Sequence, residues 1–164
     1  LFHSGVLRRI EGPRRTPALA SSSFVRNYLA YLLARASVIV SGEFHARLGT
    51  WNLSVPEWRV LACLTDADGL SVGELAAMAL MKQPRLTKVL DRMEAEGLVE
   101  RRGTAADRRR TPVHLTIKGR KLVKPVVRAA KAHEADVLKR FSDEERATIK
   151  SALDLLIGER ADKR

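Results

Sequence analysis

The sequence predicts a mainly α-helical fold that carries one small β-hairpin. Three stretches of the form S-x-x-E precede helical patterns, and in such a capping box the serine and glutamate satisfy free backbone amides of a helix's first turn. They begin at Ser54, Ser71 and Ser142. The helices that they start are predicted over about 55–66, 72–80 and 143–160. After Gly97, two β-prone runs flank a loop rich in arginine, which predicts the hairpin.

Apolar periodicity predicts the remaining helices. A long amphipathic helix is expected from Phe24 to about Gly49, because apolar residues recur there at helical spacing. Another begins at Pro84, which suits a first turn, and ends at Gly97, which suits the left-handed residue after a helix. Its predicted core face is formed by Leu86, Val89, Leu90 and Met93. Residues 118–140 return to helix, and Pro125 should kink that helix or mark a weak first turn.

The balance of charge indicates an anionic partner. The net charge is +11, from 30 basic and 19 acidic residues. Between Lys82 and Lys121 we count twelve Lys and Arg against five Asp and Glu, so this quarter of the chain holds +7 of the +11. A single cysteine excludes an internal disulfide framework, and neither a signal peptide nor an apolar run of roughly 18–20 residues is present. We therefore expect a cytoplasmic protein without a membrane segment.

Two short helices followed by a hairpin describe a winged helix-turn-helix, predicted over residues 51–117. The helix at 84–96 is then the recognition helix, whose exposed side chains suit base edges and phosphates in a major groove. These candidates are Gln83, Arg85, Thr87, Lys88 and Arg92. The flanking segments 21–50 and 118–164 are predicted to form a helical dimerisation region, and residues 1–20 an N-terminal arm without regular structure.

The arginine loop is the wing of this motif. Crowded like charges repel one another, and the repulsion is relieved when DNA supplies the counter-charge in a minor groove or at flanking phosphates. The wing candidates are Asp107, Arg108, Arg109 and Arg110. Taken alone, such a run is more often a solvated loop. Its place directly after the helix pair favours binding to double-stranded DNA.

At several motifs the sequence resembles the MarR-type transcriptional regulators. They are LSVPEWRVLACL, LSVGELAAMALMKQPRLTKVLDRMEAEGLVERR and DRRRTPVHLTIKG, and the resemblance covers about residues 22–160. The last contains the D-R-R…L-T-x-x-G wing signature of that family, which ends at Gly119. The resemblance implies that Asp107 orients an arginine that enters the minor groove. Arg109 is the first candidate for this contact and Arg108 the second. Arg85 stands where the family commonly has a small hydroxyl residue, so the base preference can differ.

The resemblance also implies an obligate homodimer, and the helix pattern supports one independently. The apolar stripes of helices 24–48, 118–140 and 143–160 are too extensive for one small module to bury. Two-fold pairing would bury them and present two recognition helices to a pseudo-palindrome with half-sites about 10 bp apart. The alternative is a monomer that folds these helices on itself and leaves long stripes exposed.

The resemblance further implies a small-molecule effector, often a phenol or an aromatic carboxylate, in a pocket between the dimer helices and the DNA-binding unit. Aromatic walls and cationic groups suited to a planar anion occur in that part of the chain. They are Arg26, His45, Trp51, Trp58 and Arg59. The equally weighted alternative is that both tryptophans fill the core while the charged groups stay in solvent.

Catalytic and metal-binding motifs are missing. The four histidines, His3, His45, His114 and His133, are scattered, with His114 predicted in a strand and His133 on a polar helix face. Cys63 lies among apolar helical residues, which favours an inert thiol over a redox sensor. We therefore expect no enzyme, no metal and no cofactor. The sequence favours a dimeric transcriptional regulator, in the form of a repressor, over a non-specific architectural DNA-binding protein or a winged-helix protein-interaction module.

Overall fold

The computed structural model describes residues 24–103 and 112–161. The chain divides after Ile39 into two units, Leu1–Ile39 and Val40–Arg164, and each is described by itself. None of the helices within the described ranges is both long and apolar enough to cross a membrane.

The N-terminal helical segment differs from the single long helix predicted. It consists of α1 (Phe24–Asn27) and α2 (Leu29–His45), with an interruption at Tyr28. The prediction of a helix to Gly49 is wrong, because the chain tightens after His45 into a 3-10 turn, η1 (Leu48–Trp51). That turn buries Leu48 and ends at Asn52 in the left-handed conformation. A tighter turn points Leu48 into the core, which periodicity alone does not reveal.

Five helices follow η1 within the described residues. They are α3 (Val55–Asp66), α4 (Val72–Met78), α5 (Gln83–Ala95), α6 (Ile117–Leu138) and α7 (Asp143–Ala161). Three of them, α3, α4 and α7, begin directly after the serine of a predicted capping box. In each of the three boxes the glutamate accepts a hydrogen bond from the serine N–H at 2.8 Å. Gly97 follows α5 with a φ of 68°, as predicted. Helix α6 continues through Pro125, and α4 is two residues shorter than expected.

The hairpin is confirmed as two short antiparallel strands. Strand β1 (Val99–Arg101) pairs with β2 (Val113–Leu115), so that Glu100 lies opposite His114. An isolated bridge between Leu70 and Val113 adds the segment between α3 and α4 to the edge of β2. The hairpin is therefore attached on one side to the helix pair.

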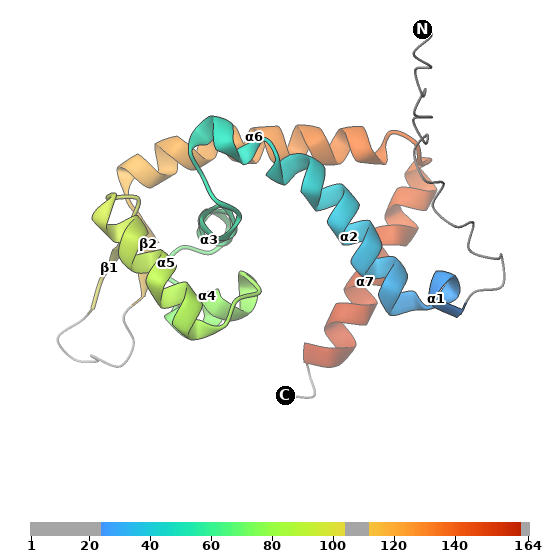
Figure 1. Ribbon diagram of the computed structural model, residues 1–164, viewed down its shortest axis with the longest axis horizontal. Helices are drawn as coiled ribbons and strands as arrows, with labels where there is room; N and C mark the ends of the chain where they lie inside the picture. Colours follow the sequence, from blue (N-terminus) through green and yellow to red (C-terminus); the bar gives the residue numbers. More distant parts are fainter. Residues whose placement is uncertain (1–23, 104–111, 162–164) are drawn as a thin grey trace, which may run out of the picture. The chain divides into compact units, whose positions relative to one another are not determined.

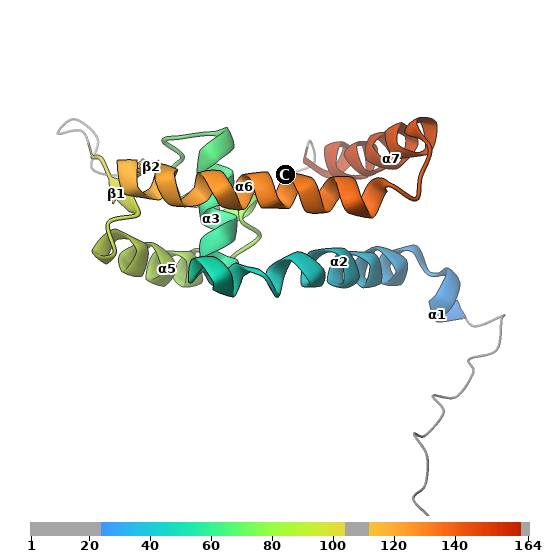
Figure 2. The same ribbon diagram turned by 90° about the horizontal axis from the view of Figure 1, so that it is seen from above.

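A single core holds the helix pair, the hairpin and α6 together. Figures 1 and 2 show α3 between α5 and α6. The largest fully buried side chains come from η1, α3, α4, α5, both strands and α6: Leu48, Val60, Leu61, Leu64, Leu75, Leu86, Leu90, Met93, Val99, Val113 and Val126. Burial of this apolar surface is the main contribution to stability, at about 1.5–3 kcal/mol for each large side chain. It fixes α5 against α3.

Candidate nucleic-acid interface

Helix α5 has one buried and one exposed face, as the sequence predicted. Leu86, Val89, Leu90 and Met93 are buried, and the candidates Gln83, Arg85, Thr87, Lys88 and Arg92 are all exposed. The N-cap residue Lys82 makes no side-chain capping bond, and the first turn contains no acidic residue. The amides at this end carry partial positive charge from the helix dipole. Cations and helix dipole therefore act together at the start of α5.

Two of the candidates also contact their own chain. The Thr87 hydroxyl donates to the carbonyl oxygen of Gln83 at 3.1 Å. Arg92 donates to Glu57 through Nε at 3.0 Å and Nη2 at 2.7 Å, and its Nη2 also lies 3.4 Å from Ser54 Oγ. Gln83, Arg85 and Lys88 lie closer to the start of α5 than Arg92 does. Arg92 is thus tied to α3, although its side chain stays 55% exposed.

Glu57 is the buried charge on which this contact depends, and the sequence reasoning assigned it only a capping role. Burial alone would raise the pKa of its carboxyl group. Hydrogen bonds from the Ser54 side chain and backbone, and then from Arg92, outweigh burial and leave the pKa lowered. One carboxylate therefore caps α3 and holds α5.

The described part of the wing is its base. Arg101 Nη1 donates to Glu94 at 2.6 Å and Nη2 to Asp91 at 2.7 Å, which ties β1 to the exposed side of α5. The Arg102 N–H donates to the Pro112 carbonyl oxygen at 3.0 Å, so pairing continues beyond the strands. The tip lies outside the described residues, with its candidates Asp107, Arg108, Arg109 and Arg110.

Asp68 fixes the other side of the wing. Its carboxylate accepts from the Leu115 N–H at 3.0 Å and from Arg120 Nη2 at 2.7 Å, and His114 Nδ1 lies 3.4 Å away. Burial would raise the pKa of Asp68, but the bonds from Leu115, Arg120 and His114 leave it lowered. The sequence reasoning missed this residue because its partners lie about 50 positions away.

The predicted ligand residues are only partly brought together. The Phe44 ring lies 5.3 Å from Trp58, edge to face, and Trp51 and Trp58 both pack against the core while half-buried. Burial, and then the positive charge of Arg59, lower the pKa of His45. Arg26 lies in the other unit.

A groove adjoins this aromatic pair. It has a volume of about 330 Å³ and lies between α3 and α6, with Trp58, Val127 and Lys131 among its lining residues. His133 was expected on a polar face, and that prediction is wrong. Its ring stacks on Phe44 at 5.9 Å, and its Nε2 lies 2.9 Å from the Val40 carbonyl oxygen. Phe44 therefore contacts the rings of both Trp58 and His133.

Other chemical groups of the sequence make no catalytic cluster. Cys63 is half-buried, and burial and then the neighbouring Asp66 raise the pKa of its thiol. Fewer thiolates form as a result, which makes this cysteine a poor nucleophile. Within residues 24–103 and 112–161, His, Cys, Asp and Glu nowhere form a group of three that could hold a metal ion.

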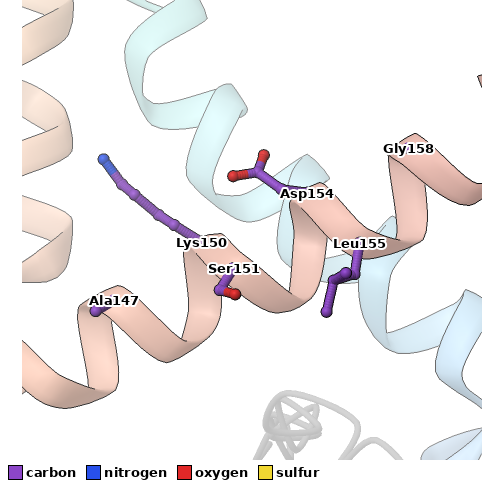
Figure 3. A pocket seen from close by; sticks show the side chains of 6 residues that line it. All are labelled: Ala147, Lys150, Ser151, Asp154, Leu155 and Gly158. Carbon is purple, nitrogen blue, oxygen red and sulfur yellow. The ribbon is translucent and has the colours of Figure 1, made fainter.

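Helix α7 exposes several apolar side chains and carries a hollow with a mixed polar and apolar lining. Ala147, Lys150, Ser151, Asp154, Leu155 and Gly158 line a hollow of about 600 Å³ along it (Figure 3). Leu153, Leu155, Leu156 and Ile157 are exposed on the same helix. Between Phe24 and Val40, in α1, α2 and the residue that separates them, ten large apolar side chains are also exposed: Phe24, Val25, Tyr28, Leu29, Tyr31, Leu32, Leu33, Val38, Ile39 and Val40.

Known proteins share both the sequence and this arrangement. A family model described as MarR family matches residues 51–110. The HTH-type transcriptional repressor Rv2887 of Mycobacterium tuberculosis is 33% identical over 128 residues, which cover 78% of this chain and 92% of the relative. The regulator PecS of Dickeya dadantii is 28% identical over 124 residues, covering 74% and 75%.

Solved structures agree with these matches. The MarR family transcriptional regulator SPO1453 from Silicibacter pomeroyi is 43% identical, with a TM-score of 0.76 over 83% of this chain and 97% of the other. The repressor CouR, solved bound to a 23-mer DNA duplex, is 26% identical, with a TM-score of 0.71 over 81% and 94%. Rv2887 in complex with salicylic acid has a TM-score of 0.64 over 78% and 95%.

A helix pair packed on α3, with a hairpin anchored beside its second helix, defines a winged helix-turn-helix protein. Combined with relatives that match most of the chain, this arrangement identifies the family. The chain belongs to the MarR family of transcriptional regulators.

Proposed function

We propose that the chain is a sequence-specific repressor that binds a pseudo-palindromic operator as a homodimer. The observation that carries the proposal is the exposed face of α5. Lys82, Arg85 and Lys88 stand on it without an acidic residue among them, above a fully apolar buried face. Three cations beside the positive end of a helix suit the phosphates and base edges of a major groove.

The wing supplies the second contact in this proposal. Its base is held by Arg101 and Asp68, and the arginines that follow in the sequence, Arg108, Arg109 and Arg110, would reach the DNA. Asp107 would orient Arg109 for a minor groove, as the family resemblance implies. CouR, which shares the fold, has been solved bound to DNA, and this supports the assignment.

A second copy of the chain would cover the exposed apolar faces of α2 and α7. Large apolar patches on a protein in water mark interaction sites. The small side chains of Ala147, Ser151 and Gly158 allow a partner helix to approach the hollow on α7 closely (Figure 3). Segments 21–50 and 118–164 would then form the dimerisation region, with 51–117 as the DNA-binding unit. Two-fold symmetry would present two copies of α5 to two half-sites.

An effector would act by changing the separation of the two recognition helices. DNA needs both at a fixed spacing, so a ligand that prefers another spacing lowers affinity in proportion to that preference. Structures of Rv2887 contain salicylic acid or p-aminosalicylic acid. In this chain Trp58 offers an aromatic wall, Arg59 a cationic group and His45 an imidazole, which supports a planar aromatic anion as the effector class.

Selection of bound duplexes from a random pool tests the proposal. The affinity of the purified chain is measured for the selected duplex and for a scrambled duplex of equal composition, over a range of salt. We expect a preference of at least about a thousandfold, and two chains on each duplex by analytical ultracentrifugation. Equal affinity for both duplexes would identify an architectural protein. Absence of salt-dependent DNA binding would identify a protein-interaction module instead.

A further inference from the structure

The turn between α4 and α5 contains a leucine in a conformation that normally selects glycine. Helix α4 ends in a Schellman motif, in which the Leu80 N–H donates to Ala77 O at 3.2 Å and the Met81 N–H to Ala76 O at 2.9 Å. Ala79 is the C-cap residue, so Leu80 occupies the following position. Its φ is 55°, in the left-handed region. Glycine is the usual residue there because it has no Cβ to clash with the backbone.

Burial of the Leu80 side chain does not offset the energetic cost of this backbone conformation. Its side chain is 77% exposed, whereas the next residue, Met81, packs against the core. In the described residues the other non-glycine position with positive φ is Asn52, a residue type that tolerates this region. An exposed leucine held in an unfavourable backbone conformation is the pattern expected of a functional contact rather than of a structural one.

The surroundings of Leu80 indicate which partner it contacts. It precedes the first residue of α5, Gln83, by three positions, so the two Cα atoms lie within about 11 Å of each other. No acidic residue occurs between Glu74 and Asp91, while Lys82, Arg85 and Lys88 all lie in that span. An exposed apolar side chain close in the chain to three cations, with no acidic residue nearby in the sequence, fits a partner that is anionic yet also offers C–H groups. Duplex DNA has both, through its phosphates and through thymine methyls and deoxyribose.

We propose that Leu80 makes an apolar contact with the C–H surface of bound DNA, at a thymine methyl or at the deoxyribose of the strand beside α5. The inference rests on the proposed function, because it requires that α5 binds DNA. Leu80 would thereby lower the stability of the free protein and raise its affinity for DNA. Glycine at this position would suit the fold and would fail to make the contact.

Three substitutions separate the conformational effect from the contact. Leu80→Gly should raise the thermal midpoint by about 2–4 °C and weaken operator binding by about five- to tenfold. Leu80→Ala, which keeps a Cβ in the same conformation, should weaken binding equally without that rise in the midpoint. Leu80→Met, the matched control, should keep wild-type affinity within about twofold because an apolar side chain of similar size remains.

Uracil in place of thymine distinguishes the two C–H sources, because it removes only the methyl group. If one dT→dU change in each half-site weakens the wild type but not Leu80→Ala, the contact is a thymine methyl. If no dT→dU change weakens binding of the wild type, while Leu80→Ala still binds the operator more weakly than the wild type, the contact is a deoxyribose. Unchanged affinity of Leu80→Ala, or an altered monomer–dimer equilibrium, would overturn the inference. A wild-type protein that binds no duplex would instead reject the proposed function.

Discussion

Arg92 donates two hydrogen bonds to one oxygen of the Glu57 carboxylate, from Nε at 3.0 Å and from Nη2 at 2.7 Å. The other oxygen accepts from Ser54, through its backbone N–H at 2.8 Å and its hydroxyl at 2.6 Å. The same carboxylate therefore starts α3 and fixes α5 against it. Because Arg92 lies on α5, this ion pair helps to set the direction in which α5 presents its exposed face.

Removing Arg92 and removing Glu57 should lower the free energy of unfolding by different amounts. Arg92→Ala should lower the free energy of unfolding by about 1 kcal/mol, because the arginine is half-exposed and Glu57 keeps its bonds to Ser54. Glu57→Ala should cost about 2–3 kcal/mol, since it removes the cap and the buried partner together. Urea denaturation of both variants measures this difference.

Operator affinity then tests whether Arg92 also contacts DNA. If it only positions α5, both variants should lose affinity by a similar factor and keep the salt slope of the wild type. A larger loss for Arg92→Ala, with a salt slope lower by about one, would show a direct phosphate contact. Equal stability of Arg92→Ala and the wild type would contradict the role of the pair.

Asp68 should link the stability of the wing to pH. Its pKa is lowered in the folded protein, so the folded state binds this proton less readily than the unfolded state. The stabilisation is present above the ordinary value of 3.8 and is lost as the pH falls through the lowered value. Asp68→Asn should remove this acid-dependent part and destabilise the protein by about 1 kcal/mol near neutral pH.

Hydrogen exchange of the Leu115 amide reports this contact locally. Asp68→Asn should speed the exchange of that amide, because its acceptor becomes weaker. Asp66→Asn, a nearby exposed carboxylate at the end of α3, serves as the matched control and should leave the exchange unchanged. If both variants behave alike, Asp68 does not anchor the wing.

Gly119 shows how a motif found in the sequence gains a physical reason from the fold. A Cβ added at Gly119 would lie 2.1 Å from the backbone oxygen of Leu98, so the first turn of α6 can approach β1 only without a side chain. Gly119→Ala should therefore cost at least about 1–3 kcal/mol, through displacement of the hairpin from α6. Gly49→Ala, with open space around the new Cβ, should change stability by less than about 0.5 kcal/mol. Thermal unfolding of the two variants decides the matter.

Local signals were sufficient to predict most of the fold. The serine and glutamate of each capping box lie three residues apart, and Gly97 directly follows the helix that it ends. A short stretch of sequence therefore contains both partners of each interaction. Asp68 and Glu57 also bind residues distant in the chain, and no local pattern in the sequence reveals those distant partners. The end of α2 was missed for a related reason, because burial of Leu48 depends on packing in three dimensions.

Arg85 and Lys88 should have different roles in recognition. Arg85 lies two residues into α5, where its planar guanidinium can bind guanine through two hydrogen bonds, and Lys88 lies one turn later, nearer a phosphate. Arg85→Ala should relax the sequence preference at one position of each half-site, at a cost of about 1–3 kcal/mol. Lys88→Ala should weaken all duplexes alike and lower the salt slope by about one.

Selection of bound duplexes by each variant measures the preference, and titration over a range of salt measures the slope. Arg85→Lys is the informative control, because it keeps the charge but cannot make the paired hydrogen bonds. If neither alanine variant changes the preferred sequence, Arg85 contacts the backbone and the bases are read elsewhere on α5 or by the wing.

Titration of His45, whose pKa is influenced by Arg59, should make the response to an effector depend on pH. Burial and the positive charge of Arg59 lower the pKa of His45, so the imidazole is mostly neutral at neutral pH. A carboxylate bound between the two groups would favour the protonated imidazole and raise that pKa. Binding would then take up a proton, and benzoate should release the protein from its operator at lower concentration at about pH 6 than at about pH 8.

Benzamide, a neutral analogue of the same shape, should release the protein from its operator at neither pH. Arg59→Ala should weaken the action of benzoate about tenfold while operator binding without ligand stays intact. Release by benzamide as effective as release by benzoate would contradict a site for anions.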